Sequence, residues 1–412
     1  MTPHRVVVVG ASLAGLRAVE AARKADADCS ITLVGAERHV PYDRPPLSKD
    51  LLKVDADRDH TEFRTAQTLR DEIGVELVLG ATAERLDTAA CTVVVRDDGG
   101  SREIDYDSLV LATGSSPRQL PGTEGLDGVH VLRTIEDSRA IRAALENGAR
   151  TVVVGAGFIG SEIASAARAR GLPVTIVEAM DTSLVRAVGS RLGAVCGALH
   201  AANGTTLLTG AKVDAIEGDG HVERVRLADG SVLDADLVVV GVGAAPNTGW
   251  LESSGLSIEN GVVCDEYLRA GPPGVFAAGD IARWHNPIFD RSMRIEHWTN
   301  AAEQGGRAAR NALDLENATP YASVPYFWSD WYGSRIQFVG VPNDDEVQVV
   351  AGELGSDHFV ALYREDDRIC GVLTLNGQRH VMKYRKLISA RGSFADALEL
   401  ARTIPARTSS GD

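Results

Sequence analysis

A duplicated segment constrains the fold of this chain more than any other feature of its sequence. Residues 4–23 read HRVVVVGASLAGLRAVEAAR and residues 149–168 read ARTVVVGAGFIGSEIASAAR. Each copy is an apolar run, a glycine-rich turn and an alanine-rich stretch, which is typical of a buried parallel strand leading into a helix. The sequence therefore predicts an α/β fold with two Rossmann-like domains, one built on each copy.

An acidic residue follows each copy. A second apolar strand, ITLVGAE or VTIVEA, carries Glu37 or Glu178 at or near its end. In a dinucleotide-binding fold the helix N-terminus faces the pyrophosphate, and the acid accepts a hydrogen bond from a ribose hydroxyl. One G-x-G-x-x-G is weak evidence, but two copies in this context are strong. We expect two dinucleotide sites.

The first glycine motif departs from the pattern. Ser12 replaces the second glycine in GASLAG, at the position where the backbone comes closest to the phosphates, whereas GAGFIG is intact. Serine is small and can donate a hydrogen bond, so binding is still expected; the alternative is a turn that holds no nucleotide. Gly15 and Gly160 are expected to let each helix pack closely on its strand.

Three further segments read as strands that end in turns: residues 106–122, 236–251 and 272–283. The last, PPGVFAAGDIAR, ends in Gly279 and Asp280 and places a carboxylate at the carboxyl edge of a sheet, where ligands of such folds bind. Two dinucleotides in one chain suggest a flavin that exchanges electrons with a nicotinamide.

Composition excludes several classes of function. The formal net charge of −15 argues against a general binder of nucleic acid or of anionic membranes. The sequence has no apolar run of 18 residues, and its N-terminus leads directly into a strand, so neither a membrane span nor a signal peptide is expected. The five cysteines are scattered singly, which predicts no metal site and no disulfide framework, and favours a reducing cytoplasm.

The ordered motifs GASLAG, PYDRPPLSK, LATGSSPR, GAGFIGSE, VGAAPN, AAGD and FWSD resemble those of the FAD-dependent NAD(P)H:ferredoxin reductases. These putidaredoxin reductase-like enzymes serve bacterial haem monooxygenases and ring-hydroxylating dioxygenases. The resemblance covers about residues 5–390. It implies a discontinuous FAD domain, an NAD domain nested inside it and a small α+β C-terminal domain, with the boundaries 1–115 and 245–318 for FAD, 116–244 for NAD, and 319–412 for the C-terminal domain.

The resemblance gives Lys49 a specific role. In the family the lysine of P-P-L-S-K lies beside the reactive edge of the flavin and pairs with the glutamate that matches Glu162, so both are candidate catalytic residues. A buried ammonium must be paired, and Pro45 and Pro46 restrict the chain before it. Ser48 is expected to cap the helix that follows. The alternative is a solvated lysine in a first helical turn, where it would oppose the helix dipole.

The remaining candidate residues are carried over from the family position by position. The resemblance assigns to FAD Gly10, Ser12, Leu13, Ala14, Gly15, Glu37, Arg44, Pro45, Lys49, Ala83, Ala112, Thr113, Gly114, Arg133, Gly279, Asp280, His297 and Trp298. It assigns to NAD Gly155, Gly157, Phe158, Ile159, Gly160, Glu178, Arg186 and Gly243. Arg133 could equally be a surface arginine. NADH is expected over NADPH, because Glu178 would repel a 2′-phosphate.

The expected chemistry belongs to the cofactors. The sequence offers no nucleophile–base pair and no redox pair of cysteines, so NADH would reduce FAD, and the electrons would pass singly to another protein. The resemblance implies that this partner is a [2Fe–2S] ferredoxin. The reductase itself is expected to be a monomer or a weak homodimer. Alternatives are reduction of a rubredoxin or small quinone-like acceptor, or an apoptosis-inducing-factor-like protein whose flavin switches its binding.

Two tryptophans in FWSDW bear on the partner. In the family the tryptophan that matches Trp328 sits between flavin and partner, whereas position 331 usually holds glutamine. Packing in the C-terminal domain is the alternative for both residues, and the favoured one for Trp331. Candidates for a basic patch that meets an acidic ferredoxin, or simply solvated side chains, are Arg307, Arg310, Lys383, Arg385 and Lys386.

Overall fold

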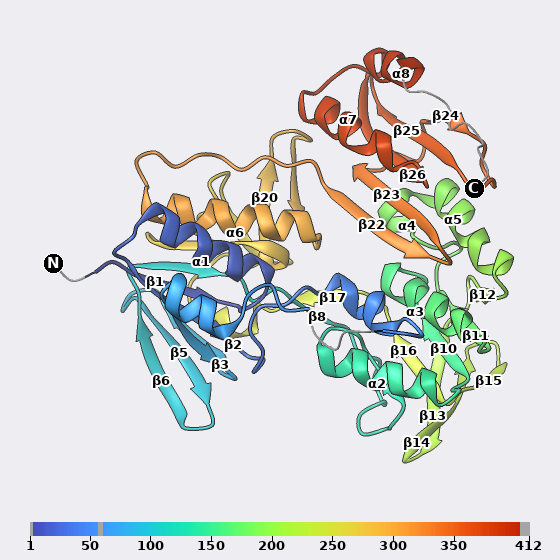
Figure 1. Cartoon of the computed structure of the whole chain (residues 1–412), viewed down its shortest axis with the longest axis horizontal. Coiled ribbons are helices and arrows are strands. Elements are labelled where there is room, and N and C mark those ends of the chain that lie inside the picture. Colours follow the sequence, from blue (N-terminus) through green and yellow to red (C-terminus); the bar gives the residue numbers. More distant parts are fainter. Residues whose placement is uncertain (1–2, 57–60, 404–412) are drawn as a thin grey trace. The chain divides into compact units, whose positions relative to one another are not determined.

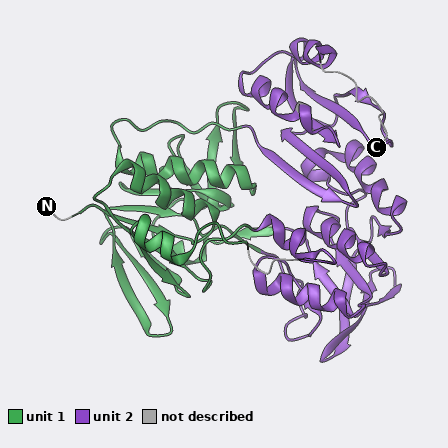
Figure 2. Ribbon diagram, in the orientation of Figure 1, with its two compact units in different colours: residues 1–43, 60–116, 244–323 green, residues 44–59, 117–243, 324–412 purple. Residues whose placement is uncertain are grey.

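The computed structural model describes residues 3–56 and 61–403, which divide into two units (Figure 2). Unit 1 comprises the described residues of 1–43, 60–116 and 244–323. Unit 2 comprises those of 44–59, 117–243 and 324–412. The described residues 44–56, which include Lys49, therefore belong to unit 2, although segments of unit 1 flank them in the sequence.

Unit 1 is built on a parallel sheet of order β19-β7-β1-β2-β3. The strands are β1 (Arg5–Val9), β2 (Ser30–Gly35), β3 (Val75–Leu79), β7 (Ser108–Leu111) and β19 (Val275–Ala277). Helices α1 (Leu13–Ala25) and α6 (Trp298–Leu313) lie side by side on one face of it (Figure 1). The four valines of β1 are buried, as expected of a central strand covered on both faces.

Smaller elements complete unit 1. A three-stranded antiparallel sheet, β4-β5-β6, contributes Leu86, Val93 and Val95 to the core. The remaining elements are β4 (Thr82–Asp87), β5 (Thr92–Asp97), β6 (Gly100–Asp105), β18 (Val262–Cys264), β20 (Ala282–Asn286), β21 (Arg291–Arg294), a π-helical turn η3 (Thr68–Glu72), and the 3₁₀ turns η4 (Gly249–Leu251) and η5 (Gly279–Ile281). Strands β8 (Ser115–Pro117) and β17 (Ala244–Pro246) pair where the chain leaves and re-enters the unit.

Unit 2 contains a second parallel sheet, of order β12-β11-β10-β16-β9. Its strands are β9 (Val129–His130), β10 (Thr151–Val154), β11 (Val174–Val177), β12 (Thr206–Leu208) and β16 (Leu237–Val240). Its helices are α2 (Ile135–Glu146), α3 (Phe158–Ala169), α4 (Val185–Val188) and α5 (Ser190–Ala202). An antiparallel sheet follows, formed by β13 (Val213–Asp219), β14 (His221–Leu227) and β15 (Val232–Asp234).

The duplication extends further than the sequence showed. In unit 1 the order β1-α1-β2-β3 is followed by the three-stranded sheet and then by β7, which pairs with β1. In unit 2 the order β10-α3-β11 leads to β12, a three-stranded sheet and β16, which pairs with β10. Each unit thus repeats a complete dinucleotide-binding topology, with the glycine-motif strand between the acid-bearing strand and the closing strand.

The C-terminal part of unit 2 is an antiparallel sheet of order β22-β23-β26-β25-β24 with two helices. Its elements are β22 (Tyr326–Trp331), β23 (Ser334–Gly340), β24 (Val347–Gly352), β25 (Phe359–Glu365), β26 (Arg368–Leu375), α7 (Gln378–Ser389) and α8 (Phe394–Thr403). The predicted fold class is therefore confirmed: two doubly wound parallel sheets and a C-terminal α+β region. Within residues 3–56 and 61–403, no helix combines the length and apolar composition that a membrane crossing requires.

Candidate active site

Two glycines in each motif are required by the packing of the chain itself. Gly10 has a φ of +122°, and a Cβ there would lie 2.0 Å from the carbonyl oxygen of Ala112. A Cβ on Gly15 would lie 2.0 Å from the carbonyl oxygen of Gly10. The second motif repeats this arrangement, since a Cβ on Gly160 would lie 2.3 Å from the carbonyl oxygen of Gly155. These positions hold strand, turn and helix together.

The middle position of each motif is different. A Cβ on Gly157 would meet nothing nearer than 4.0 Å, and its φ of −82° suits any residue. Ser12 likewise has an extended backbone, which explains how a serine is tolerated in the first motif. Packing therefore does not require a glycine at position 157. The absence of a side chain there leaves open space at the N-terminus of α3. That space fits a phosphate group, which helix N-termini favour.

The FAD candidates of unit 1 gather at the carboxyl ends of its parallel strands. Residues 112–114 follow β7, and Gly279 follows β19. Gly279 also lies close to Ala14: a Cβ on Gly279 would be only 3.1 Å from the Cβ of Ala14. The hydroxyl of Ser115 donates to Asp280 (2.8 Å). The fold thus brings the first glycine motif and the Gly-Asp turn together at one edge of the sheet, the edge where such folds bind ligands.

Other FAD candidates of unit 1 have partners that the sequence did not reveal. The hydroxyl of Tyr42 donates to Glu37 (2.5 Å), and the indole N–H of Trp298 donates to Asp43 (2.7 Å). His297 is the N-cap residue of α6, and burial lowers its pKa to about 4, against the opposing charge of Asp280.

The rest of the FAD set divides between the units. In unit 1, Thr113 is clamped by the side chain of Asn247, which donates to its carbonyl oxygen (2.9 Å), and Ala83 lies in β4 against the core. In unit 2, the guanidinium of Arg44 donates to the carbonyl oxygen of Arg133. The backbone N–H of Arg133 donates to Asp137 (2.9 Å), the acid of the capping box at α2. The Arg133 residue is half-buried.

The NAD candidates of unit 2 form a matching set around the second motif. Both carboxylate oxygens of Glu178 are engaged, one by the backbone N–H of Ala156 in the glycine turn (2.7 Å) and one by that of Met180 (2.8 Å). Ile159 is exposed at the start of α3, and Arg186 is exposed on α4. Gly243 follows β16 with a φ of +102°. The acid is therefore tied to the turn that would cradle a pyrophosphate.

Lys49 and Glu162 form a buried ion pair. The Nζ of Lys49 lies 2.5 Å from the Oε1 of Glu162, and the two side chains are 17 % and 3 % exposed. Glu162 lies in α3, two residues after the last glycine of the motif, so the helix that begins the NAD candidate site also carries the partner of Lys49. A buried pair with excellent geometry holds its ammonium in one place, because leaving either charge unpaired would be costly.

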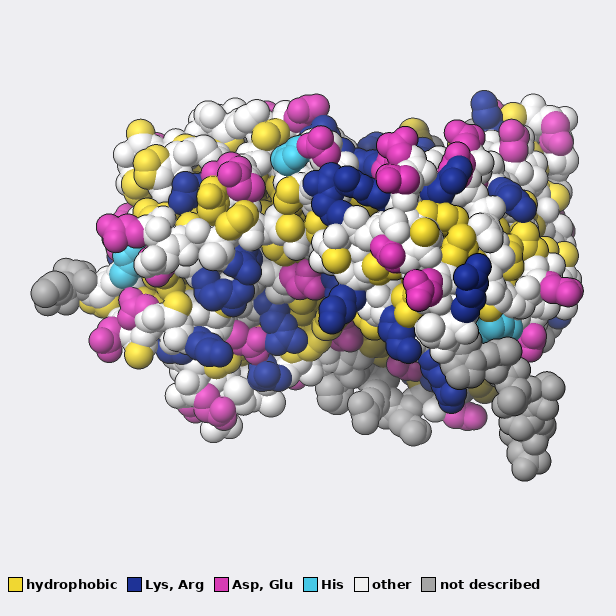
Figure 3. All heavy atoms as spheres, turned by 90° about the horizontal axis from the view of Figure 1, so that it is seen from above, with side chains coloured by type: hydrophobic (Ala, Val, Ile, Leu, Met, Phe, Trp, Pro, Cys, Tyr) yellow, Lys and Arg dark blue, Asp and Glu magenta, His cyan; other side chains and the backbone are white. Residues whose placement is uncertain are grey.

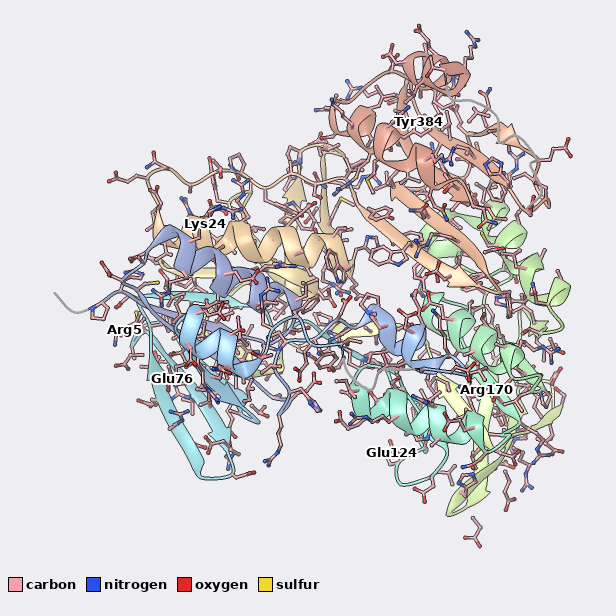
Figure 4. The ribbon with its side chains drawn as sticks, in the orientation of Figure 1. Arg5, Lys24, Glu76, Glu124, Arg170 and Tyr384 are labelled. Atoms are coloured by element: carbon pink, nitrogen blue, oxygen red, sulfur yellow. The ribbon has the colours of Figure 1, made fainter. Side chains whose placement is uncertain are left out.

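Several contacts hold the segment around Lys49. Pro45 and Pro46 occupy the first positions of the 3₁₀ turn η1 (Pro45–Ser48), where their fixed φ is favourable. The hydroxyl of Ser138 in α2 donates to the carbonyl oxygen of Leu47 (2.7 Å). Arg170, which follows α3 (labelled in Figure 4), donates to the carbonyl oxygen of Leu52 (2.6 Å) at the end of η2 (Asp50–Leu52). Lys49 is thus fixed from both sides.

The prediction that Ser48 caps a following helix is wrong. The segment forms two short 3₁₀ turns, Ser48 ends the first of them, and Lys49 is the N-cap residue of the second. This turn directs the Ser48 hydroxyl toward α3, where it donates to the Oε2 of Glu162. Ser48 therefore supports the carboxylate that pairs with its neighbour.

A third donor to Glu162 comes from β22 and was missed from the sequence. The hydroxyl of Ser329 donates to Oε1 of Glu162, and the backbone N–H of Asp330 lies 3.4 Å from the same oxygen. The rings of Phe158 and Phe327 also meet, 4.4 Å apart. Burial alternates along β22, so Phe327, Ser329 and Trp331 all point inward, and the first two of them contact α3.

Trp331 is fully buried, as the packing interpretation expects, whereas Trp328 is half-buried and stacks on Tyr326 (5.7 Å). The indole of Trp331 stacks on His200 (5.0 Å), and its N–H donates to Ser329 (2.7 Å). His200 also lies within hydrogen-bond distance of Ser161 (3.2 Å) and Tyr332 (2.8 Å). Burial lowers the pKa of His200 to about 4, so it is neutral at pH 7.

The candidate basic residues differ in exposure. Arg310 is exposed and Arg307 half-buried on α6, and Lys383 and Lys386 are exposed on α7. The guanidinium of Arg385 donates to the carbonyl oxygen of Val324 (3.1 Å), so this side chain is held against the backbone.

Fold and site together define a class of protein: an oxidoreductase scaffold with two dinucleotide-binding folds and a C-terminal α+β region. Comparison with known families agrees. The pyridine nucleotide-disulphide oxidoreductase family matches residues 4–305, and the reductase C-terminal family matches residues 326–405. The chain belongs to the pyridine nucleotide-disulphide oxidoreductase family and, within it, to the putidaredoxin reductase-like ferredoxin reductases that the sequence predicted.

Individual relatives cover nearly the whole chain. It is 37 % identical to rhodocoxin reductase of Rhodococcus erythropolis, over 93 % of this chain and 89 % of the relative. It is 36 % identical to the ferredoxin–NAD(+) reductase component of the anthranilate 1,2-dioxygenase system of Burkholderia cepacia, over 97 % and 98 %. A solved reductase from a covalent putidaredoxin reductase–putidaredoxin complex superposes with a TM-score of 0.90 at 31 % identity, over 98 % and 99 %.

The different demands on the glycines of the second motif predict separable effects. Gly157→Ala should leave the free energy of unfolding unchanged, but weaken NADH binding about tenfold, because its Cβ enters open space needed for a phosphate. Gly160→Ala should destabilise the protein by about 1–3 kcal/mol through overpacking. Urea titrations and NADH titrations measure the two effects. Unchanged NADH affinity in Gly157→Ala would show that this motif does not form part of the NADH-binding site.

The buried His200 predicts a loss of stability in mild acid. Its pKa of about 4 in the folded protein lies below the unfolded value of about 6.5, so the folded state binds fewer protons between these values. Stability present above pH 6.5 is therefore lost as the pH falls toward 4. From pH 7 to pH 5 this residue should account for about 2 kcal/mol. Urea unfolding of the unmodified protein and of His200→Gln at both pH values measures it; an equal loss in both proteins contradicts it.

Proposed function

We propose that the protein takes a hydride from NADH onto FAD and passes the electrons singly to a [2Fe–2S] ferredoxin that serves a haem monooxygenase or a ring-hydroxylating dioxygenase. The observation that carries the proposal is the complete duplication of the dinucleotide-binding topology in one chain, each copy with its own glycine motif and acid. The names of the Burkholderia relative and of the putidaredoxin complex support the electron acceptor.

The proposed domains follow from the two copies of the dinucleotide-binding topology. Residues 1–115 and 245–318 bind FAD, residues 116–244 bind NADH, and residues 319–412 form the C-terminal domain. Support comes from the glycine turns: the outer glycines of each are needed by the fold, and the second turn has open space at its middle position, Gly157, that fits a phosphate. Glu37 and Glu178 would accept hydrogen bonds from adenosine riboses.

The residues around Lys49 have a defined electrostatic task in this proposal. When bound, FAD supplies the chemistry: it accepts a hydride and gives up electrons one at a time. Lys49 provides a positive charge that stabilises negative charge on the reduced ring. Glu162 fixes that charge in place, and neither residue needs to transfer a proton. One NADH supplies two electrons, so two ferredoxin molecules are reduced for each NADH.

The electron acceptor must lie outside the chain. The five cysteines, all within the described residues, are free thiols, and four of them are buried, so no cysteine pair could relay electrons. Free thiols also fit a cytoplasmic location. The described residues hold no cluster of His, Cys, Asp and Glu side chains that could bind a metal ion.

The proposed partner surface combines charge and aromatic side chains. The face drawn in Figure 3 carries Lys and Arg side chains among Asp and Glu, although the net charge of the chain is −15. Such basic side chains could steer an acidic ferredoxin. Trp328 is proposed to lie between flavin and partner. We propose that the protein acts as a monomer or weak homodimer.

The function is tested with the purified protein under anaerobic conditions. A flavin absorption spectrum should be present, or should appear after FAD is added, and excess NADH should bleach it. Reduction of a [2Fe–2S] ferredoxin should then proceed with two ferredoxins reduced per NADH, as absorbance spectroscopy measures. Rubredoxin and a small quinone serve as comparison acceptors.

Three outcomes would contradict the proposal. They are the absence of a flavin spectrum after FAD is added, a flavin that stays oxidised under excess NADH, and turnover with rubredoxin or quinone that exceeds turnover with every [2Fe–2S] ferredoxin tested.

The engagement of Glu178 predicts cofactor preference. A 2′-phosphate would lie against a carboxylate that two backbone N–H groups already hold, so kcat/KM should be higher with NADH than with NADPH, by about tenfold or more. Glu178→Gln removes the charge and should narrow the ratio mainly by improving NADPH. Equal efficiencies for the two donors with the unmodified protein would refute the assignment.

A further inference from the structure

We propose that Ser329 and Trp331 are positioning residues for the Lys49–Glu162 pair, acting through a directed hydrogen-bond chain from β22. The proposal rests on the proposed function, in which Lys49 stabilises reduced flavin. The chain runs from the indole N–H of Trp331 to the Oγ of Ser329 (2.7 Å), and from Ser329 to the Oε1 of Glu162, which lies 2.5 Å from the Nζ of Lys49.

The direction of this chain follows from the chemistry of its members. An indole nitrogen can only donate, so the oxygen of Ser329 must accept from Trp331. A serine hydroxyl has one hydrogen, which then points to Glu162. Because an ionised carboxylate only accepts, every bond in the chain has one possible polarity. Trp331 thereby fixes the hydroxyl of Ser329 as a donor.

The carboxylate of Glu162 is held at both oxygens. Oε2 accepts from Ser48, and Oε1 accepts from Ser329 and from Lys49. The terminal torsion of a glutamate is broad, so few intrinsic forces set the orientation of its carboxylate. The two hydroxyl donors supply that constraint on opposite oxygens. Without Ser329 the carboxylate could rotate away from Lys49, and the ammonium would follow it.

Trp331 is itself immobilised. It is fully buried and stacks on His200, which is buried and close to Ser161, the residue before Glu162. The hydroxyl of Tyr332 lies within hydrogen-bond distance of His200 and of Thr205 (2.9 Å). The support therefore returns to α3 itself, and packed polar groups of this kind restrict motion when each has a partner.

A double-mutant cycle in the apoprotein tests the chain without cofactor. Trp331→Phe alone should lower the urea midpoint, because a buried hydrogen bond is lost. In a Ser329→Ala background the same change should lower the midpoint by less, because the indole N–H has already lost its acceptor there, whereas the loss of buried ring volume is the same in both backgrounds. This smaller effect is the expected result. Equal effects of Trp331→Phe in both backgrounds would overturn the directed chain.

The second test measures positioning in the holoprotein. In anaerobic stopped-flow experiments, Ser329→Ala should slow flavin reduction at saturating NADH about tenfold, the effect of losing one hydrogen bond to a charged group, and leave the NADH dissociation constant unchanged. In a Glu162→Gln background, Ser329→Ala should have no further effect, because it acts through Glu162. Ser329→Cys, which keeps a weak donor, should recover part of the rate.

Thr374→Val is the matched control. Thr374 is fully buried in β26 of the same sheet, and its hydroxyl has no hydrogen-bond partner among the described residues. This variant loses a buried hydroxyl that takes no part in the hydrogen bonds from Trp331 to Glu162. Its rate of flavin reduction should therefore match that of the unmodified protein. If Ser329→Ala behaves like Thr374→Val, or slows reduction equally in the Glu162→Gln background, the positioning role is wrong.

The two proposals fail in different ways. An unmodified protein that binds no FAD, or is not reduced by NADH, refutes the proposed function. An unmodified protein that is reduced normally, with a Ser329→Ala variant that is reduced equally fast, refutes only the positioning role. The apoprotein cycle is independent of both results, because it requires neither cofactor.

Discussion

The carboxylate of Glu162 is the group on which the organisation of unit 2 depends. It is almost fully buried, and a buried charge is tolerated only when it is paired and hydrogen-bonded. Its side-chain donors come from two separate parts of the sequence: Ser48 and Lys49 from the proline segment, and Ser329 from β22. Because each must reach the same two oxygens, the proline segment, α3 and β22 are fixed relative to one another within this unit.

A second constraint acts on the glycine motifs, in which the outer and the middle positions have different roles. Gly10 and Gly15 are needed because backbone atoms of neighbouring segments occupy the space of their side chains. Gly157 is not needed for that reason, and Ser12 shows that its counterpart can be replaced. The outer glycines therefore build the turn, and the fold does not require a glycine at the middle position. This division explains why one motif can vary without loss of the fold.

Much of the architecture could be predicted because it is written locally. The strand, turn and helix of each copy lie within 20 consecutive residues, and the resemblance added the order of the remaining motifs. The pairing of Lys49 with Glu162 came from the resemblance, since the two residues lie 113 positions apart. The role expected for Ser48 was wrong, because the segment forms two short 3₁₀ turns that aim its hydroxyl at α3.

The sequence by itself determined two dinucleotide-binding folds, because a glycine turn, a buried strand and a following acid are set by backbone sterics and burial over short distances. Only the tertiary structure decided which hydroxyl groups surround Glu162. Ser329 lies 167 residues from it, and the alternation of β22 turns both Ser329 and Trp331 inward. The direction of a hydroxyl depends on which donors and acceptors packing brings within reach, and no local pattern encodes that.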